Sequence, residues 1–170
     1  GGLLFLPFMA GERAPNWNSD ARGVFFGLNL GHGRHHLVRA IMEGIVFQVA
    51  GIYQVVSELC GTASSVRATG GFARSSVWLS IMADIFETPL DTLPNVEGSA
   101  TGAAALARTA LLGLDQMDWV DRRVQPSRRV EPDPGSSRLY KDLYGQYMRL
   151  YNLLADEFSA IADYQRRRCP

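Results

Sequence analysis

The sequence predicts an α/β fold. Short apolar runs bounded by Gly and Pro alternate with longer segments in which apolar residues recur every three or four positions, patterns typical of strands and helices respectively. Their order is strand, strand, helix, strand, helix, strand, helix, helix, which indicates helices layered on a sheet. The 170 residues, 46% of them hydrophobic, are enough to bury one core, so we expect one domain.

The first third of the chain predicts two strands and a long helix. Residues 3–9 form a continuous apolar run, consistent with a strand buried on both sides. Residues 10–22 are rich in Gly, Pro, Asn and Asp and predict a loop, and residues 23–28, bounded by glycines, predict a second strand. After a turn at residues 32–34, a helix that ends at Gly61 is expected. Its apolar stripe consists of Leu37, Ile41, Ile45, Val49, Ile52, Val56 and Leu59.

Three further elements follow Gly61. Residues 66–69 are predicted as a short buried strand that turns through paired glycines into a helix over residues 77–86. Residues 89–93 predict another short strand. Residues 100–112 predict a helix whose many alanines suit close packing against a sheet.

The last part of the chain predicts a crossing segment and a long helix. Residues 115–135 are polar and contain prolines, so we interpret them as a crossing over the surface. A helix is predicted over residues 140–161, with a wide aromatic stripe and with Ser136 or Ser137 as its N-cap. We expect this stripe to pack in a core or against another domain rather than to form a partner groove, and the three arginines at 166–168 to be a frayed tail.

Composition excludes several classes of partner. The 17 basic and 17 acidic residues give zero formal charge, which argues against a nucleic-acid partner, because phosphate binding needs a basic excess on one face. No stretch approaches the apolar length of a membrane span and no signal peptide is recognised, so no membrane partner is expected. Cys60 and Cys169 lie far apart and predict neither a disulfide nor a zinc site, which suits a reducing cytoplasm. Because the chain begins with Gly1-Gly2 rather than Met, we expect a piece of a larger protein.

The turn at Gly70 and Gly71 is the most informative feature of the sequence. A strand that passes through paired glycines into a helix leaves backbone N–H groups pointing outward with no side chain over them. Nucleotides dock on such turns, since glycine permits close approach and a helix N-terminus favours negative charge. Many strand-to-helix turns need glycine for the turn alone, so both interpretations stay open.

Two segments fit the second signature of the FGGY carbohydrate kinases. They are residues 23–28 and, after a gap of seven residues, residues 36–43. Residues 6–17 and 20–23 resemble the segment that precedes this signature. Within it, the Gly-Glu-Arg-Ala-Pro of residues 11–15 is most similar to the gluconate kinases, with the xylulose kinases next.

The resemblance continues downstream. Residues 69–75 resemble the family's adenosine motif, which usually has three glycines followed by a small residue, and residues 97–104 resemble the start of the next family helix. The proline-bearing crossing and the Tyr-rich last helix also resemble the family. The likeness covers nearly all of this chain, but only the C-terminal part of a family member.

The resemblance implies a ribonuclease-H-like domain of the actin/hexokinase type, a mixed sheet with flanking helices. Residues 1–165 would be the C-terminal nucleotide-binding domain and residues 166–170 a tail, with the N-terminal catalytic and sugar-binding domain absent. The implied activity is ATP-dependent phosphorylation of gluconate or a xylulose-like sugar in the cytoplasm, with the Mg²⁺ site mainly outside this chain. The apolar face left by the missing domain would favour self-association of the chain, for example as a homodimer. A non-catalytic actin-like module that binds nucleotide or a protein is the alternative.

Four residues are carried over as nucleotide-binding candidates. Gly70 and Gly71 match the adenosine motif, where their lack of side chains would let the nucleotide lie against the backbone. Phe72 stands where the family usually has a third glycine, and its ring would either line the adenine pocket or point into the core. Ser75 would either contact the base or sugar or serve as an ordinary N-cap.

Other candidates receive weaker assignments. Arg13 and Glu12 would bind substrate, with Arg13 clamping the carboxylate of gluconate, or else pair with each other to stabilise their loop. Trp17 is expected to anchor that loop in the core, and Glu43 is given no chemistry. The histidines lack an acidic or cysteine partner for a metal set, so a surface turn is favoured; they are His32, His35 and His36.

No catalytic residue is assigned. A kinase of this kind needs an aspartate as base, a phosphate loop and a magnesium site, which in the family lie upstream of this region. The aspartates weighed and not assigned are Asp20, Asp84, Asp91, Asp115 and Asp118. We therefore expect the isolated chain to be inactive.

Overall fold

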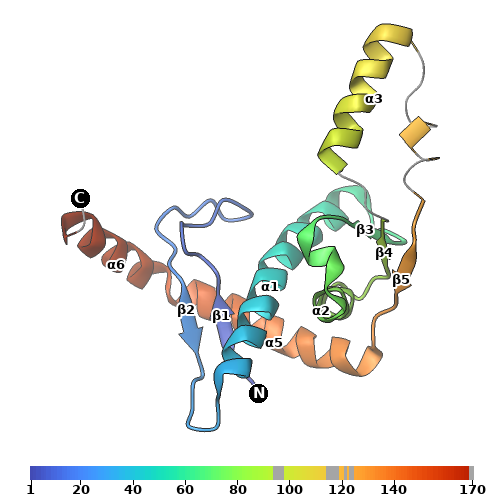
Figure 1. The fold of residues 1–170 in the computed structure, drawn as a ribbon. Coiled ribbons are helices and arrows are strands. Elements are labelled where there is room, and N and C mark those ends of the chain that lie inside the picture. The colour runs from blue at the N-terminus through green and yellow to red at the C-terminus, as the bar shows by residue number, and fades with distance from the viewer. Residues whose placement is uncertain (94–97, 114–118, 121, 123–124, 169–170) are drawn as a thin grey trace. The chain divides into compact units, whose positions relative to one another are not determined.

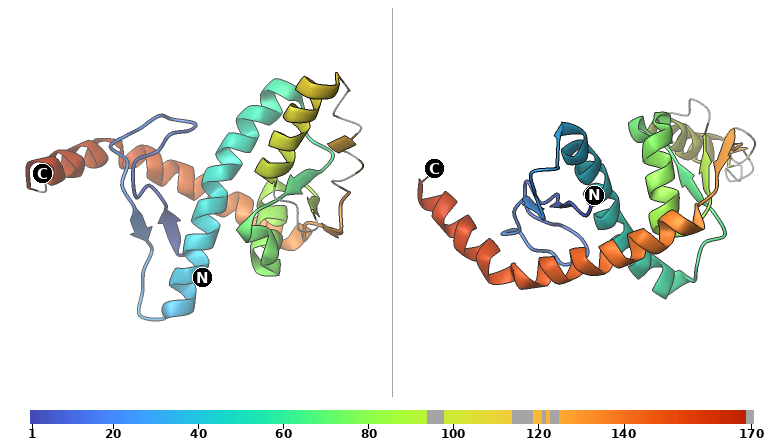
Figure 2. Two further views of the ribbon diagram at one scale, coloured as in Figure 1. Left: turned by 45° about the horizontal axis from the view of Figure 1, so that its top comes forward. Right: turned by 90° about the horizontal axis from the view of Figure 1, so that it is seen from below.

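The computed structural model describes residues 1–93, 98–113, 119–120, 122 and 125–168. The chain divides into two compact units. Unit 1 comprises Gly1–Thr62 together with Pro134–Pro170, and unit 2 comprises Ala63–Asp133. Figures 1 and 2 show the helices and strands of each unit, which are described separately below.

Unit 1 opens with a two-stranded antiparallel sheet. β1 (Leu4–Leu6) pairs with β2 (Val24–Phe26), and Phe5 lies opposite Phe25. The rings of these two residues have centroids 4.5 Å apart, and aromatic pairs across strands stabilise such a sheet. Both predicted strands are confirmed, and the apolar run of β1 is buried throughout.

The predicted long helix is α1 (Arg34–Cys60). As expected it stops at Gly61, whose φ of 82° suits glycine and whose N–H donates to the carbonyl of Ser57 at 2.9 Å. The helix lies so close to β1 that a Cβ at Gly44 would collide with the carbonyl oxygen of Phe5. A side chain at this position is therefore excluded by the packing of α1 on β1.

α1 is also long and apolar enough to cross a membrane, which corrects the expectation that no stretch is. Its most apolar window has a mean hydropathy of 1.4. Core helices pass the same test, and α1 buries Val46 and Phe47 within unit 1. Its contacts with β1 and with the tyrosines of the last helices are those of a core helix.

The single helix predicted over residues 140–161 is two helices, α5 (Pro134–Leu153) and α6 (Ala155–Arg168). α5 begins at Pro134 rather than after a serine cap, because proline lacks the N–H that the first turn leaves unpaired. The chain bends at Leu154, and aromatic residues on both sides of the bend reach Phe8. Phe8 lies 5.3 Å from Tyr151 of α5 and 6.3 Å from Phe158 of α6, measured between ring centroids.

The arginines expected in a frayed tail form the last turn of α6. Arg166 donates to Asp20 of the first loop and to Asp163, both at 2.6 Å. This contact ties the end of α6 to the loop between β1 and β2. It also lowers the pKa of Asp20, through the hydrogen bond from Arg166 above all.

Aromatic side chains from α1 and α5 form the core of unit 1. The ring of Phe47 lies 5.4–6.0 Å from three tyrosines of α5: Tyr140, Tyr144 and Tyr147. Tyr147, Tyr140 and Phe47 are all buried. The tyrosine stripe is thus core packing, as predicted.

Unit 2 contains a mixed three-stranded sheet. β3 (Val66–Ala68) and β4 (Leu90–Thr92) are parallel, and β5 (Arg128–Val130) pairs antiparallel with β4. β3 and β4 confirm predicted strands, whereas β5 falls in the segment expected to be a surface crossing. The sequence gives little sign of β5, because it is an edge strand with two exposed arginines and a single buried residue, Val130.

Unit 2 also contains the helices α2 and α3. α2 (Ser76–Phe86) packs on β4 and β5 and buries an apolar face that includes Leu79 and Ile81. α3 (Gly98–Leu112) is the predicted small-residue helix, but Ala105 is its one buried residue. Its expected close packing against a sheet is therefore wrong, because the described residues leave its other alanines uncovered.

Candidate nucleotide site

The paired glycines lie at the carboxyl end of β3. After Ala68 the chain passes through exposed Thr69 and then Gly70, whose φ of 94° strongly favours glycine. Gly71 begins a single 3₁₀ turn, η1 (Gly71–Arg74), which leads into α2. We call Thr69–Gly71 the glycine corner.

The glycine corner is open. A Cβ placed on either Gly70 or Gly71 would meet no atom of the described residues beyond its chain neighbours within 4 Å. Phe72 does not plug the corner, since its half-buried ring packs edge-on against Trp78 of α2 with centroids 6.3 Å apart. The bare backbone here is accessible to a ligand, although whether Phe72 also lines an adenine pocket stays a prediction.

The start of α3 lies beside the glycine corner. A Cβ at Gly98, the first residue of α3, would be 3.9 Å from Oγ1 of Thr69. The first N–H groups of a helix have no partner within it, and the helix dipole adds partial positive charge there. Because β3 and β4 are parallel, their carboxyl ends lie at the same edge of the sheet. Glu97, in the segment that resembles the family's helix start, lies outside the described residues.

Ser75 is the N-cap of α2. Its Oγ accepts a hydrogen bond from the backbone N–H of Trp78 at 3.4 Å. The N-cap interpretation of this residue is thus observed. A second role toward a nucleotide stays a prediction, because a serine hydroxyl can accept one bond and still donate another.

Comparison with known proteins identifies the chain. Residues 1–111 match the model of the FGGY family of carbohydrate kinases, C-terminal domain. The chain belongs to the FGGY family of carbohydrate kinases. It is 40% identical over 166 residues to gluconokinase of Bacillus subtilis and 44% identical over 154 residues to xylulose kinase of Escherichia coli.

The fold agrees with this assignment. A crystal structure of gluconate kinase from Lactobacillus acidophilus matches 94% of this chain with a TM-score of 0.80 and 32% sequence identity. The two sequence relatives are matched over 97% and 89% of this chain. In each case the match covers 32% of the relative, so this FGGY chain spans about a third of the length of the proteins it resembles.

Three of the aspartates weighed as candidate bases make structural contacts in this FGGY chain. Asp84 accepts a hydrogen bond from the backbone N–H of Asp133 at 2.8 Å. Asp91 lies 3.8 Å from Arg129 of the neighbouring strand, and Asp20 pairs with Arg166. Asp115 and Asp118 lie outside the described residues. That the catalytic base lies elsewhere in the protein stays a prediction.

The three histidines form a cluster of edge-on and tilted rings at the start of α1. The rings of His32 and His35 lie 5.2 Å and 4.0 Å from the ring of His36. Nδ1 of His36 accepts from the N–H of Gly33, and Nδ1 of His32 accepts from the N–H of Asn29, both at 3.0 Å. Desolvation and the neighbouring imidazoles lower the pKa of His36. Among the described residues no group of three His, Cys, Asp or Glu could hold a metal.

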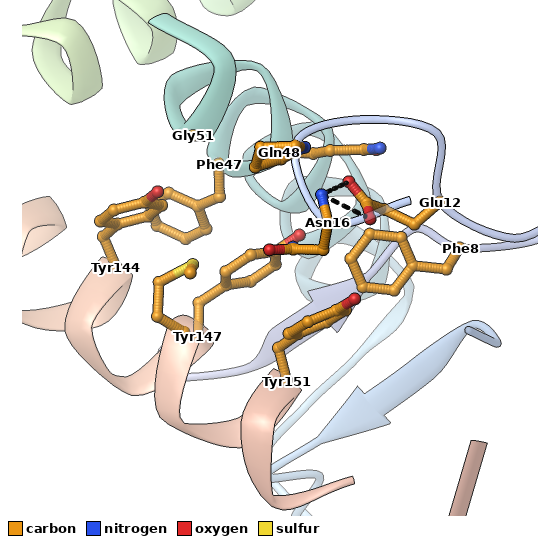
Figure 3. A pocket seen from close by; sticks show the side chains of 11 residues that line it. Phe8, Glu12, Asn16, Phe47, Gln48, Gly51, Tyr144, Tyr147 and Tyr151 are labelled. Carbon is orange, nitrogen blue, oxygen red and sulfur yellow. Dashed lines mark hydrogen bonds between the residues drawn. The ribbon is translucent and has the colours of Figure 1, made fainter. Parts of the chain in front are cut away.

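The loop before β2 differs from expectation at two residues. Trp17 is 79% exposed and has a φ of 54°, so its predicted role as a core anchor is wrong. Glu12 is buried, and its carboxylate accepts from the backbone N–H of Asn16 rather than pairing with exposed Arg13 (Figure 3). Glu12 therefore holds its own loop, while a substrate contact for Arg13 stays a prediction.

Sequence reasoning missed one polar cluster in unit 1. The hydroxyl of Tyr140 donates to Glu43 at 2.8 Å and accepts from Arg39 at 2.6 Å, and Arg39 also bonds Glu43 at 2.6 Å. Desolvation raises the pKa of Tyr140 to about 12. The cluster joins α1 to α5, and no sequence pattern links residues so far apart.

Proposed function

We propose that the whole protein transfers the γ-phosphoryl group of ATP to a hydroxyl of a sugar or sugar acid, gluconate or a xylulose-like sugar. This chain supplies the half that binds adenosine. The observation that carries the proposal is the open glycine corner at the carboxyl end of β3, beside the first turn of α3. Open α/β sheets bind ligands at this edge.

The corner suits a nucleotide in two ways. Gly70 and Gly71 leave the main chain uncovered, so a flat nucleoside can lie against it. A helix N-terminus such as the start of α3 favours the negative charge of phosphate. The chain's own residues would thus bind and orient ATP.

We assign the Mg²⁺ ligands, the sugar site and the catalytic base to parts of the protein outside this chain. The described residues include no cluster that would hold Mg²⁺, so we propose that the metal is held by the ATP phosphates and by the part of the protein that precedes this chain. The sugar site and the base that accepts the hydroxyl proton are assigned to that same part. The names of the relatives support gluconate or xylulose as substrate, in a cytoplasmic metabolic enzyme.

Gly71→Asp in the full-length protein tests the proposal. Gly71 has an ordinary φ and open space around its Cβ position, so the variant should fold normally. A carboxylate there would occupy the nucleotide's place and repel phosphate. We expect the affinity for ATP, measured by calorimetry, to fall at least about tenfold, which corresponds to about 1.4 kcal/mol.

Gly145→Asp is the matched control, since Gly145 is also exposed and open but lies on α5 in unit 1. It should bind ATP as the parent does. Equal ATP affinity in Gly71→Asp and the parent would contradict the proposed site. A coupled assay with gluconate and xylulose then identifies the acceptor, and nucleotide binding without phosphorylation of any sugar would favour the non-catalytic actin-like module.

A further inference from the structure

Helix α1 has a second apolar face that the described residues leave largely uncovered. Its first face is buried against β1 and the tyrosines of α5, through residues that include Gly44 and Phe47. On the opposite face apolar residues recur at alternating spacings of four and three, which places them in one line along the helix. We call this line the outer stripe; its residues are Val38, Met42, Ile45, Val49, Ile52, Val56 and Leu59.

The outer stripe is exposed along most of its length. The exposed fractions are 51% at Val38, 38% at both Val49 and Ile52, 49% at Val56 and 80% at Leu59. A helix that meets water on one side normally carries polar and charged side chains on that side. A continuous apolar surface marks a place where another element binds.

The absence of charge in the middle of α1 indicates what kind of contact the stripe makes. No Asp, Glu, Lys or Arg occurs from residue 44 to residue 57, which is why the mean hydropathy of α1 reaches 1.4. A helix that is apolar on all sides is normally buried on all sides. Permanent interfaces are more apolar than transient ones. The outer stripe therefore suits a partner that stays on α1 throughout the life of the folded protein.

The preceding part of the protein reaches unit 1 beside the first turn of α1. Nε2 of His32 lies 3.1 Å from the carbonyl oxygen of Gly1, and a Cβ at Gly1 would lie 3.4 Å from the ring of His36. The relatives are about three times as long as this chain, and residues 1–111 match the C-terminal domain of the family. In a protein of that length, most residues precede Gly1 and join unit 1 at the N-terminal end of α1.

We propose that an apolar element of the part of the protein that precedes Gly1 packs against the outer stripe of α1. A segment of the same polypeptide is held near the stripe at a high effective concentration, which favours it over a second copy of the protein or a lipid surface. Its binding would complete the burial of α1. The inference concerns unit 1 alone and does not depend on nucleotide binding at the glycine corner, which belongs to unit 2.

Photo-crosslinking in the full-length protein tests the proposal directly. The photoreactive residue p-benzoylphenylalanine replaces Ile52 or Val56 on the outer stripe. Glu58, which is exposed on the opposite side of α1, is the matched control position. We expect mass spectrometry to find both stripe positions, but not position 58, joined to peptides that precede Gly1. Crosslinks confined to residues 1–170, crosslinks to a second copy in an isotope-mixed sample, or no crosslinks at the stripe would overturn the proposal.

Thiol accessibility gives an independent readout with a side chain small enough to preserve folding. Val56→Cys and Glu58→Cys are made in full-length protein that carries Cys60→Ser, because Cys60 is exposed, and alkylation at each position is followed by mass spectrometry. We expect Val56→Cys to react at least about tenfold more slowly than Glu58→Cys, at low and high protein concentration alike. Equal rates would overturn the proposal. Protection that is lost on dilution would assign the stripe to a second copy, and protection that requires lipid vesicles would assign it to a membrane; either result would overturn the proposal too.

Discussion

Gly44 in unit 1 and Gly71 in unit 2 lack side chains for opposite reasons. A Cβ at Gly44 would strike the carbonyl oxygen of Phe5, so this glycine lets α1 and β1 pack closely. A Cβ at Gly71 would meet nothing within 4 Å, and Gly71 does not have the positive φ that makes glycine necessary in a turn. Among the described residues, neither packing nor backbone conformation requires glycine at position 71.

The difference separates structure from function within one chain. Where neighbouring atoms fill the space around a glycine, the protein itself requires that residue. Where the space is empty, as it is at Gly71 and also at Gly145, the described residues do not require glycine. At Gly71 we propose a nucleotide as the reason, because this residue lies at the sheet edge where such folds bind ligands. Substitutions at Gly44 in unit 1 therefore test packing, and substitutions at Gly71 in unit 2 test nucleotide binding.

Gly44→Ala should give the largest effect on stability. The added methyl group forces α1 away from β1, and overpacking of this kind costs about 3 kcal/mol of the free energy of unfolding. Urea unfolding of the full-length protein measures the loss. Gly145→Ala, in α5 with open space around it, should instead leave stability equal or raise it by about 0.5 kcal/mol. Equal effects of the two variants would break the comparison.

Tyr140→Phe should cost less, about 1 kcal/mol. The variant removes two hydrogen bonds beside the α1–β1 contact but leaves Arg39 and Glu43 paired with each other at 2.6 Å. The same unfolding experiment measures it. Loss of more than twice this amount would show that the hydroxyl, rather than ring packing on Phe47, holds α5 to α1.

The same residue predicts a pH dependence. Desolvation raises the pKa of Tyr140 from 10.0 to about 12, so folding favours the protonated hydroxyl. Its contribution is complete below pH 10 and is lost as the pH rises from 10 to about 12. Burial also raises the pKa of Tyr144, Tyr147 and Tyr151, so the ultraviolet titration of phenolate in Tyr140→Phe is subtracted from that of the parent, and the difference should be one tyrosine that ionises well above pH 10. Ionisation of that tyrosine near pH 10 would contradict the burial.

Ser75→Ala should give the smallest change in stability, up to about 1 kcal/mol, because α2 loses its N-cap. The same variant tests whether Ser75, next to the glycine corner, also contacts the nucleotide. If Ser75 only caps α2, ATP affinity stays within about twofold of the parent in calorimetry. A fall of about tenfold or more would assign Ser75 a direct contact with the nucleotide.

Much of the fold could be predicted because its elements are long or carry clear boundary residues. The helix α1, its stop at Gly61 and the strand–glycine–helix order of unit 2 are visible in the sequence. The predicted apolar stripe is not the buried face of α1, however, because Val49, Ile52, Val56 and Leu59 are exposed, whereas the buried residues are Ala40, Gly44, Val46, Phe47, Ala50 and Gly51. β5 could not be found in this way, since three residues with one buried side chain carry no periodic pattern. The bend at Leu154 likewise depends on two helices reaching Phe8, a tertiary contact.

The candidate site was predictable to the same degree. Gly70 and Gly71 are adjacent in sequence, so their turn and their openness follow from local chemistry. The closeness of Gly98 to Thr69 depends on how unit 2 folds. The burial of Glu12 beside Tyr147 and the exposure of Trp17 also depend on tertiary packing, which reversed the expectation for Trp17.

A crystal structure of the full-length protein with a non-hydrolysable ATP analogue tests the central claim most directly. The account predicts that the adenosine lies against the backbone of Gly70 and Gly71, with phosphate oxygens toward the first turn of α3. Nucleotide density at another place, with the glycine corner bare, would contradict it.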